Sequence, residues 1–388
     1  MNKCHFLGKL TEDPAIGKSY NSIFVNFTLE IEEYRRDKDG VKKRRTDFLK
    51  FQAWDSAAKT IKNRAQKDDI MVIEAIARNE ASKNPDTVIF PRSSCKIIQA
   101  LPLLETGSAK KFSLGPKHLA LACASHSGGQ IHLNVAKDWL QKTGLNEQDL
   151  LCGCHFPYDR NQTKKLKKNG EKPCQLHNNC SGKHLSFLTI SKTIFHKNDY
   201  GSNYIDINHP VQKIVKKTFE EITGFQNPIH ALDGCSAPNF ACSIKSLAKA
   251  MAVFSNPNQL EQNRKRYIED LKNAVLSHPD LIAGEERLCT KIIKKSNGRL
   301  IVKVGADGVY TAILLDKGLG IALKICDGSK KAAECLIVTL LIRLGYLKSD
   351  DEDFFNYLNI PIYNWSKMKT GIIKTSSQIW QQGKQLDF

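Results

Sequence analysis

The sequence predicts an α+β protein in which a small β-barrel precedes a larger domain, with helices flanking a mainly antiparallel sheet. Segments that alternate apolar and polar residues occupy roughly the first eighty positions, whereas later segments repeat apolar residues near helical spacing. Two apolar runs on either side of a glycine-rich turn, residues 300–304 and 309–315, predict a β-hairpin in the larger domain.

Four alternating segments and one short helical stretch make up the N-terminal part. Strands are expected at Cys4–Gly8, Ser22–Ile31, Asp47–Trp54 and Asp69–Ala77, and a helix at Ser56–Ala65 between the last two strands. Strand, strand, strand, helix, strand is the order of a small OB barrel. We therefore expect one domain at residues 1–84 and a second at residues 85–388.

Several motifs in the first domain resemble bacterial single-stranded DNA-binding protein. They are Leu7-Gly-Lys-Leu-Thr-Glu-Asp-Pro14, Val25-Asn-Phe-Thr-Leu29, the basic segment from Tyr34 to Phe48, and Ala53-Trp54. In that family bases stack on aromatic side chains while basic side chains follow the phosphates. The resemblance implies stacking by Tyr34, Phe48 and Trp54 and single-stranded DNA as a partner, although Phe48 and Trp54 would alternatively fill the barrel.

The barrel is expected to be incomplete. The family's final strand should follow Arg78, but the chain continues instead through Asn79-Glu-Ala-Ser-Lys-Asn-Pro-Asp. The apolar triplet Val88-Ile-Phe90 directly precedes Pro91-Arg-Ser93 and is expected to belong to the second domain. A barrel without its last strand leaves an edge to be covered.

In the second domain, helices are expected in four places where apolar residues recur near helical spacing. These are His132–Thr143, Pro210–Thr223, Gln259–Leu276 and Ser329–Leu344. The hairpin at residues 300–315 brings Lys303 toward a common pocket. The second domain is therefore expected to contain strands flanked by helices.

Ser93-x-x-Lys96 is the first motif that carries chemistry. Residues three apart lie on one face of a helix, where a neutral lysine could deprotonate the serine. The pair alone is weak, because Ser-x-x-Lys occurs by chance and usually lies on a solvated helix face. Further blocks raise its weight: Ala122-Cys-Ala-Ser-His-Ser-Gly128, Asn179-Cys-Ser-Gly-Lys-His184, Leu232-Asp-Gly-Cys-Ser-Ala-Pro238 and Lys303-Val-Gly-Ala-Asp-Gly-Val-Tyr310.

Taken together, these blocks resemble the Rhizobium-type L-asparaginases, also called asparaginase II or thermolabile asparaginases, from about Pro85 to Lys374. The resemblance implies a fold like that of serine β-lactamases and glutaminases, hydrolysis of L-asparagine to L-aspartate and ammonia, and a homodimer. Asparagine and glutamine differ by one methylene group, and no residue in the sequence indicates which of the two substrates is preferred.

Amide hydrolysis needs a nucleophile, a base, donors for the oxyanion and groups that hold the substrate. The resemblance implies two serine–lysine tandems, Ser93 with Lys96 and Ser125 with a distant lysine. We assign that lysine to Lys303 and secondarily to Lys324. Ser93 is the expected nucleophile and Ser125 completes the proton relay. A lysine serves as base only if burial or nearby cations lower its pKa.

Four further residues are expected to contact or position the substrate. Arg92 would bind a carboxylate, although a structural ion pair is the alternative. His126 would position its loop or the substrate, and His184 and Asp233 would contact the substrate or support the residues around them.

Cys180, Lys183 and Cys235 form the expected metal site. From spacing alone the two cysteines read as buried thiols, but two thiolates from separate turns favour a metal such as zinc. The resemblance implies that both cysteines bind Zn²⁺ with Lys183 as third ligand, which would organise the substrate site.

Composition bounds these hypotheses. The chain has 388 residues, 12 cysteines and a formal net charge of +18. Scattered cysteines, no secretion signal and apolar runs too short to span a bilayer predict reduced thiols, no membrane partner and a cytoplasmic location. The excess of basic residues is spread along the chain, so the net charge does not distinguish between the candidate functions.

Two alternative functions remain. The chain could be a single-stranded DNA-binding protein with an inactive asparaginase-like half, but every matched catalytic position holds a competent residue. Acylation by β-lactams is disfavoured because the partner motif Ser-Asp-Asn is absent and Lys369-Thr-Gly371 lies too near the end.

Overall fold

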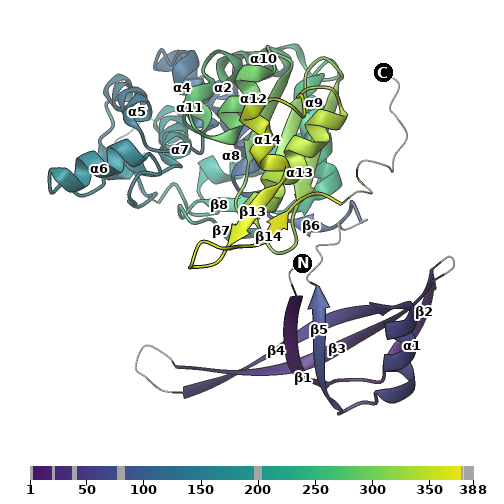
Figure 1. Ribbon diagram of the computed structural model, residues 1–388. Helices are drawn as coiled ribbons and strands as arrows, with labels where there is room; N and C mark the ends of the chain where they lie inside the picture. Colours follow the sequence, from purple (N-terminus) through teal and green to yellow (C-terminus); the bar gives the residue numbers. More distant parts are fainter. Residues whose placement is uncertain are drawn as a thin grey trace. The chain divides into compact units, whose positions relative to one another are not determined.

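The computed structural model describes residues 3–19, 22–36, 42–76, 84–195 and 203–376, together with Ile379. Contacts between residues divide the chain into two compact units, one of residues 1–78 with 362–371 and one of residues 79–361 with 372–388. Figure 1 shows both units, each of which is described by itself. Each also has its own cluster of buried apolar side chains.

The first unit contains a five-stranded antiparallel sheet and one helix. Its strands are β1 (Lys3–Leu10), β2 (Ala15–Ser19), β3 (Ser22–Arg36), β4 (Lys42–Trp54) and β5 (Ile70–Ile76), and its helix is α1 (Asp55–Arg64). The sheet order is β2-β3-β1-β5, and β4 pairs with β3. The four predicted strands and the helix are confirmed.

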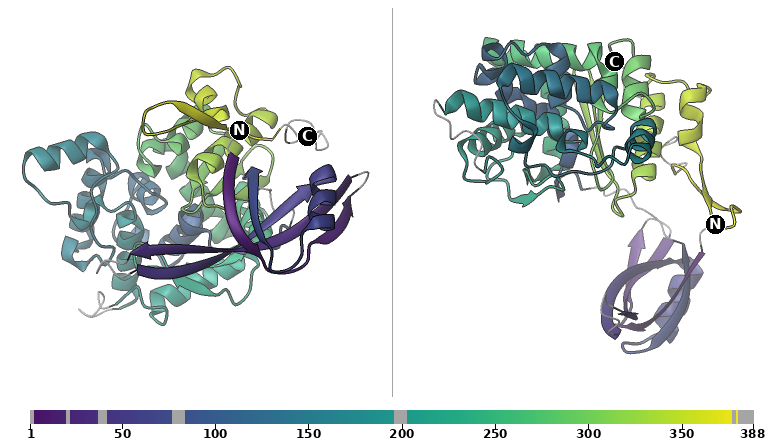
Figure 2. Two further views of the ribbon diagram at one scale, coloured as in Figure 1. Left: turned by 60° about the horizontal axis from the view of Figure 1, so that its bottom comes forward. Right: turned by 90° about the vertical axis from the view of Figure 1, so that its left-hand side faces the viewer.

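Alternation in β3 explains which side of the sheet is buried. Val25, Phe27 and Leu29 are buried together with Leu10 and Ala58, whereas Asn26 between them is exposed. This is the pattern of a strand with one face on a core. The strands curve around this core (Figure 2), in agreement with the predicted barrel-like region.

The second unit begins with the short strand β6 (Val88–Ile89), which pairs with β9 (Cys242–Ser243). This pairing confirms that the segment before Pro91 belongs to the second unit rather than to the barrel. Residues 77–83, where the barrel would continue, lie outside the described part of the chain.

Helices dominate the second unit. The α-helices of eight residues or more are α2 (Lys96–Glu105), α5 (Gln130–Thr143), α6 (Arg160–Lys168), α7 (Ser181–Ile194), α8 (Pro210–Thr223), α9 (Ile244–Ser255), α10 (Gln262–Ser277), α12 (Leu288–Lys295) and α13 (Lys330–Arg343). Four of them confirm the helices predicted from apolar spacing. Ser329, the predicted start of the last, caps α13 by accepting a hydrogen bond from the Ala332 amide.

Shorter elements complete the unit. The short helices are η1 (Arg92–Cys95), α3 (Ser108–Lys111), α4 (Pro116–Ala122), η2 (Glu147–Asp149), η3 (Gln175–His177), α11 (Pro279–Ile282) and α14 (Glu352–Leu358). Its remaining strands are β7 (His230–Leu232), β8 (Pro238–Phe240), β10 (Leu300–Val304), β11 (Val309–Leu314) and β12 (Leu319–Lys324). The last two strands, β13 (Ile360–Tyr363) and β14 (Lys369–Ile373), form a hairpin whose residues 362–371 group with the first unit.

The central sheet of this unit has the order β10-β11-β12 and is antiparallel throughout. All residues of β10 and β11 are buried, because the sheet lies inside the helical layers rather than at the surface. The predicted hairpin is confirmed, and β12 adds a third strand to it. Lys303 therefore lies on a fully buried strand, so its amine is removed from water.

Candidate active site

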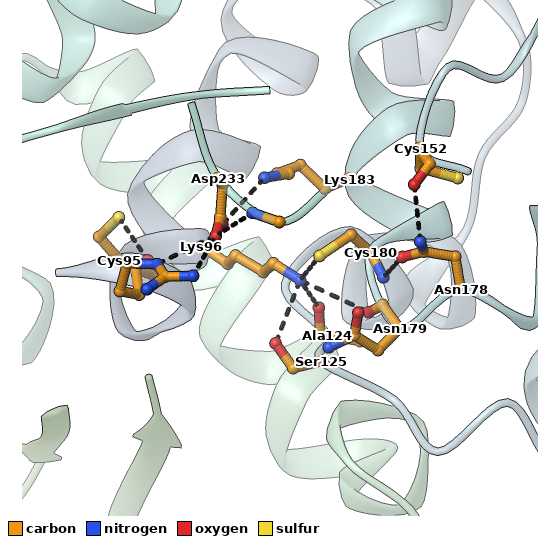
Figure 3. A network of polar contacts seen from close by, with 12 residues as sticks. Cys95, Lys96, Ala124, Ser125, Cys152, Asn178, Asn179, Cys180, Lys183 and Asp233 are labelled. Atoms are coloured by element: carbon orange, nitrogen blue, oxygen red, sulfur yellow. Dashed lines mark hydrogen bonds and ion pairs between the residues drawn. The ribbon is translucent and has the colours of Figure 1, made fainter. Parts of the chain in front are cut away.

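Lys96 lies at the centre of a buried polar cluster where η1 passes into α2. Its side chain is fully buried. Its amine donates to the Ala124 carbonyl oxygen at 2.6 Å and lies 3.1 Å from Ser125 Oγ and 3.2 Å from Cys180 Sγ. Figure 3 shows these contacts converging on the amine from two loops. The Lys96 amine thus connects the loop that carries Ser125 with the loop that carries Cys180.

Ser93 and Lys96 do not form the hydrogen bond that helical spacing suggests. Ser93 is partly buried, and none of the hydrogen bonds among the described residues joins it to Lys96. Residues 92–95 form one turn of 3-10 helix, after which the Lys96 side chain extends into the interior toward Ser125. Lys96 therefore does not pair with Ser93 as expected. It contacts Ser125 instead, and Ser93 remains partly accessible.

Ser125 follows α4 in an extended loop. Its side chain is 5% exposed, and its backbone amide donates to the Ile282 carbonyl oxygen at 2.9 Å. The neighbouring His126 amide donates to the Asn179 carbonyl oxygen at 3.2 Å. These backbone bonds fix the serine loop beside the N-terminus of α7, where Cys180 lies.

The distant lysines differ sharply in environment. Lys303 is 8% exposed, and burial, reinforced by the charge of Lys96, lowers its pKa to about 7. Its amine donates to the Val304 carbonyl oxygen at 2.9 Å, and no hydrogen bond joins it to Ser125 among the described residues. Lys324 instead donates to the carbonyl oxygens of Asp307 and Ile325 at 2.7 and 2.6 Å, so it stabilises a turn.

The two expected metal-binding cysteines lie together. Cys180 precedes α7 and Cys235 lies in the turn between β7 and β8, and the two buried thiols share a hydrogen bond. That bond, helped by the charge of Lys183, lowers the pKa of Cys235, whereas the same bond and burial raise the pKa of Cys180. Of the two thiols, Cys235 is therefore the one whose thiolate form is favoured.

Lys183 lies in the first turn of α7 beside this thiolate. Burial alone would lower its pKa, but Cys235, Cys180 and Asp233 together raise it above the ordinary value. Its amine is 3.8 Å from Asp233 Oδ2 (Figure 3). Among the described residues, no group of three or more histidine, cysteine, aspartate or glutamate side chains is placed to hold a metal ion. A metal here would therefore need the Lys183 amine as a ligand.

Arg92 is held by two carboxylates. Its Nε and one terminal nitrogen donate to Asp233 Oδ1 at 3.0 and 2.8 Å, and its other terminal nitrogen contacts Asp307 Oδ2. Asp307 is an exposed residue of the β10–β11 turn, with 61% of its side chain exposed, whereas Asp233 is only 9% exposed. The structure thus shows the ion-pair arrangement, in which the more exposed carboxylate is the more easily replaced.

Backbone geometry supports this placement of Arg92. Its φ angle is +54°, a left-handed conformation that costs free energy in a residue other than glycine. The opposing turn approaches closely because Gly305 lacks a Cβ, which would lie 2.6 Å from the Pro91 carbonyl oxygen. The two loops are consequently in direct contact, and Asp307 reaches the guanidinium.

The two histidines are buried and neutral. His126 Nδ1 accepts from the Gly128 amide at 3.1 Å and its Nε2 lies 2.9 Å from Ser181 Oγ, so the ring links two loops. Burial lowers its pKa well below the ordinary value. His184 Nδ1 lies 2.6 Å from the Tyr204 hydroxyl oxygen, and burial lowers the pKa of His184 to about 3. The His184 Nε2 atom has no hydrogen-bond partner among the described residues.

Sequence reasoning did not single out Asp307, Cys152, Asn178 or Tyr204, which support the cluster. Asn178 donates to the Cys152 carbonyl oxygen at 2.8 Å and accepts from the Cys180 amide at 2.8 Å, which holds Cys180 in place. The only sequence signal for Asp307 is the glycine-rich Gly305-Ala-Asp-Gly308 block, which by itself indicates no more than a turn.

On the first unit, Phe48 is 61% exposed, so it does not fill the barrel. It lies opposite Glu30 in the β3–β4 register and is followed by the exposed Lys50 two residues later. The backbone register places Tyr34 opposite Arg44 and Trp54 opposite Phe24, but the side chains of Tyr34 and Trp54 lie outside the described part of the structure.

Two family models match the chain. The model of L-asparaginase II matches residues 68–375, and that of the single-strand binding protein family matches residues 1–100. Since the first match covers well over half of the chain, the protein belongs to the L-asparaginase II family, with an N-terminal segment similar to single-strand binding proteins. Among curated proteins, none matches the chain. No helix in the described residues is both long and apolar enough to cross a membrane.

Proposed function

We propose that the protein is an L-asparaginase, which hydrolyses L-asparagine to L-aspartate and ammonia by a serine–lysine mechanism. The observation that carries the proposal is the fully buried Lys96 amine, 3.1 Å from Ser125 Oγ. A base within hydrogen-bond distance of a hydroxyl is the basic requirement for activating a nucleophile. The family match supports the same class of reaction.

In the proposed reaction, Ser93 is the nucleophile because it is the more accessible of the two serines. Its oxygen attacks the side-chain amide carbon, and its proton passes through Ser125 to the amine of Lys96. The amide nitrogen takes up that proton and leaves as ammonia, which leaves an ester on Ser93. Water then attacks the ester and gives a proton to the same relay, which returns a proton to Ser93 Oγ as the ester bond breaks and aspartate leaves.

Lys303 supplies the second amine of the tandem. Because its pKa is about 7, a large fraction is neutral at physiological pH. We propose that this neutral amine serves as a second proton acceptor of the relay during the attack.

Substrate binding is assigned to the ion-pair cluster beside the serines. Arg92 offers a planar guanidinium suited to the α-carboxylate, and Asp233 offers a carboxylate for the α-ammonium group. His184 and His126 are neutral and buried, so they hold the loops around this cluster and contribute no charge.

We further propose that Cys180, Cys235 and Lys183 hold a zinc ion. The lowered pKa of Cys235 supports this assignment, since a thiolate is the form that binds zinc. The raised pKa of Lys183 means that its amine must lose a proton on binding. Zinc, when bound, would fix the thiolates and neighbouring loops and polarise the substrate site.

The decisive experiment measures ammonia release from L-asparagine by the full-length protein and by Ser93→Ala, Ser125→Ala and Lys96→Met variants. The chain offers a matched control in Ser246-x-x-Lys249 on α9, which has the same spacing outside the cluster. Activity should fall by at least about a thousandfold in the three site variants, as expected when a nucleophile or base is removed. Ser246→Ala and Lys249→Ala should leave it unchanged.

An inactive, folded wild-type protein would contradict the proposal, as would equal losses in the control variants. Mass spectrometry of the protein quenched during turnover then identifies the attacking serine. The ester should be trapped on Ser93, and an ester on Ser125 would reverse the assignment of the two serines.

A second function is supported by Phe48. We propose that residues 1–84 bind single-stranded DNA, because an exposed aromatic ring on a strand with basic neighbours is suited to base stacking. Binding of an oligothymidylate should weaken about tenfold in Phe48→Ala and remain near wild type in Ile16→Ala, a control residue that is 49% exposed on β2. Equal binding by all three proteins would contradict this function.

A further inference from the structure

The hairpin formed by β13 and β14 exposes an unusual set of side chains near the C-terminal end of the chain. The two strands pair with each other (Figure 1). Trp365 in the connecting turn is as exposed as a free side chain, at 104%, and Tyr363 and Met368 are 59% and 62% exposed. Large apolar side chains are normally at least partly covered, so a contiguous exposed group marks an interaction surface.

The turn that carries Trp365 is internally hydrogen-bonded. The Asn364 amide donates to the Met368 carbonyl oxygen and the Lys367 amide donates to the Asn364 carbonyl oxygen, both at 3.0 Å. The Asn364 side chain accepts from the Met368 amide at 2.9 Å. These bonds fix the backbone around Trp365, so little conformational entropy is lost when the indole binds a partner.

Within this segment the charged side chains are all positive, although Glu334, Glu352 and Asp353 line a pocket with Ile360 at the start of β13. Lys367, Lys369 and Lys374 interleave with the aromatic residues, and the sequence between Phe354 and Leu386 contains no aspartate or glutamate. Self-association through this hairpin would bring lysines of two copies together without a compensating carboxylate from the segment. The charge therefore favours an anionic partner over a second copy.

We infer that the β13–β14 hairpin is a contact site for single-stranded nucleic acid. Exposed aromatic rings stack on unpaired bases, and lysines beside them neutralise phosphates. A duplex is disfavoured because its bases are already stacked and unavailable to an indole. This site lies in the part of the chain that matches L-asparaginase II, outside the match to single-strand binding proteins, so it goes beyond both proposed functions.

The test measures binding of fluorescein-labelled 20-mers of oligothymidylate and oligouridylate to the full-length protein by fluorescence anisotropy. Trp365→Ala should weaken binding about tenfold, whereas Trp365→Phe should retain most of it because a ring remains. Phe355→Ala is the matched control, since this aromatic residue of α14 is 57% exposed and precedes the hairpin. The two oligonucleotides distinguish DNA from RNA as the source of the strand.

A second measurement tests the lysines. In the double variant Lys367→Gln with Lys369→Gln, the slope of log affinity against log salt should decrease by about 0.7 for each phosphate that a lysine no longer neutralises. All variants are also examined with Phe48→Ala, so that the contribution of the hairpin is separated from that of the barrel. A Trp365 effect that persists in that background supports a separate site.

Three results would overturn the inference. The first is unchanged oligonucleotide affinity in Trp365→Ala, or no binding by the wild type even at low salt. The second is a Trp365→Ala effect on sedimentation alone, which would make the hairpin a self-association surface. The third is a blue shift of Trp365 fluorescence with vesicles containing phosphatidylserine but not with oligonucleotide, which would make it a lipid contact.

Discussion

Lys303 shows how one buried amine can set both reactivity and stability. Its pKa is lowered from 10.5 to about 7, so between these pH values the unfolded chain binds more protons than the folded one. The free energy of unfolding should therefore rise with pH across this window, and the destabilisation is complete below about pH 7.

Replacement of Lys303 by an apolar side chain tests whether the buried amine destabilises the protein below about pH 7. Lys303→Met should abolish activity and yet raise the free energy of unfolding at pH 7 by about 2 kcal/mol or more, because each pKa unit corresponds to about 1.4 kcal/mol. The gain should shrink toward pH 10. Urea unfolding at the two pH values measures it, with Lys324→Met, on a partly exposed lysine, as the control. No gain at pH 7 would contradict the assigned pKa.

Asp307 provides a second prediction for a single residue. Its carboxylate contacts the Arg92 guanidinium from an exposed turn, so an incoming α-carboxylate must compete with it. Asp307→Asn should lower KM for L-asparagine severalfold with little change in kcat, and asparagine tolerates the φ of +57° at this position. Asp86→Asn, in an exposed pair with Lys245, should leave both constants unchanged. A raised KM would instead make Asp307 a substrate ligand.

Single residues were predictable where a motif carried them. Ser93 and Lys96 were singled out by their spacing, and Cys180 and Cys235 by the family resemblance; the structure places Cys180 in contact with both the Lys96 amine and Cys235. The contact between Lys96 and Ser125 was not predictable, because the two residues are 29 positions apart and are joined by loops whose path depends on backbone hydrogen bonds.

Among the elements, α7 matters most because it places Cys180 and Lys183. Gly182 makes its position possible, since a Cβ there would lie 2.1 Å from the Leu121 carbonyl oxygen at the end of α4. Gly182→Ala should therefore displace α7, lower stability by about 1–3 kcal/mol and reduce zinc content. Gly234→Ala, beside Cys235, is the control because its Cβ would meet nothing within 4 Å.

Thermal unfolding and zinc analysis of the purified variants provide the measurements. If Gly182→Ala matched Gly234→Ala in both, the close approach of the two helices would not control the site. Loss of stability with full zinc content would separate packing from metal binding and would contradict the assignment of Cys180 and Lys183 as ligands.

Elements with a strong periodic signal were predicted well, and weakly patterned ones were not. The helix α8 was predicted with its observed bounds because its apolar residues recur at helical spacing and Gly224 follows it. The short strand β2 was missed, since Ala15-Ile-Gly-Lys-Ser19 shows no alternation and is defined only by its pairing with β3. The β13–β14 hairpin was missed for the same reason.

At the scale of the whole molecule, the sequence predicted two modules because two sets of motifs follow one another. The family matches overlap at residues 68–100, so the comparisons give no sharp boundary between them. Residues 362–371 group with the first unit, a long-range assignment that local motifs could not reveal. Each unit has its own cluster of buried apolar side chains, so the two modules have separate cores.

Separate cores predict that the two proposed activities are energetically independent. Ser93→Ala should leave oligonucleotide affinity unchanged, and Phe48→Ala should leave kcat/KM for L-asparagine unchanged. Because coupling between two binding sites is reciprocal, saturating L-aspartate should change the Kd for oligothymidylate by less than about twofold, and oligonucleotide should change the Kd for L-aspartate equally little. Titration calorimetry with each ligand in the presence of the other measures both. Equal shifts of about tenfold in the two titrations would show that nucleic acid regulates the enzyme, and the two modules would then act as one allosteric unit.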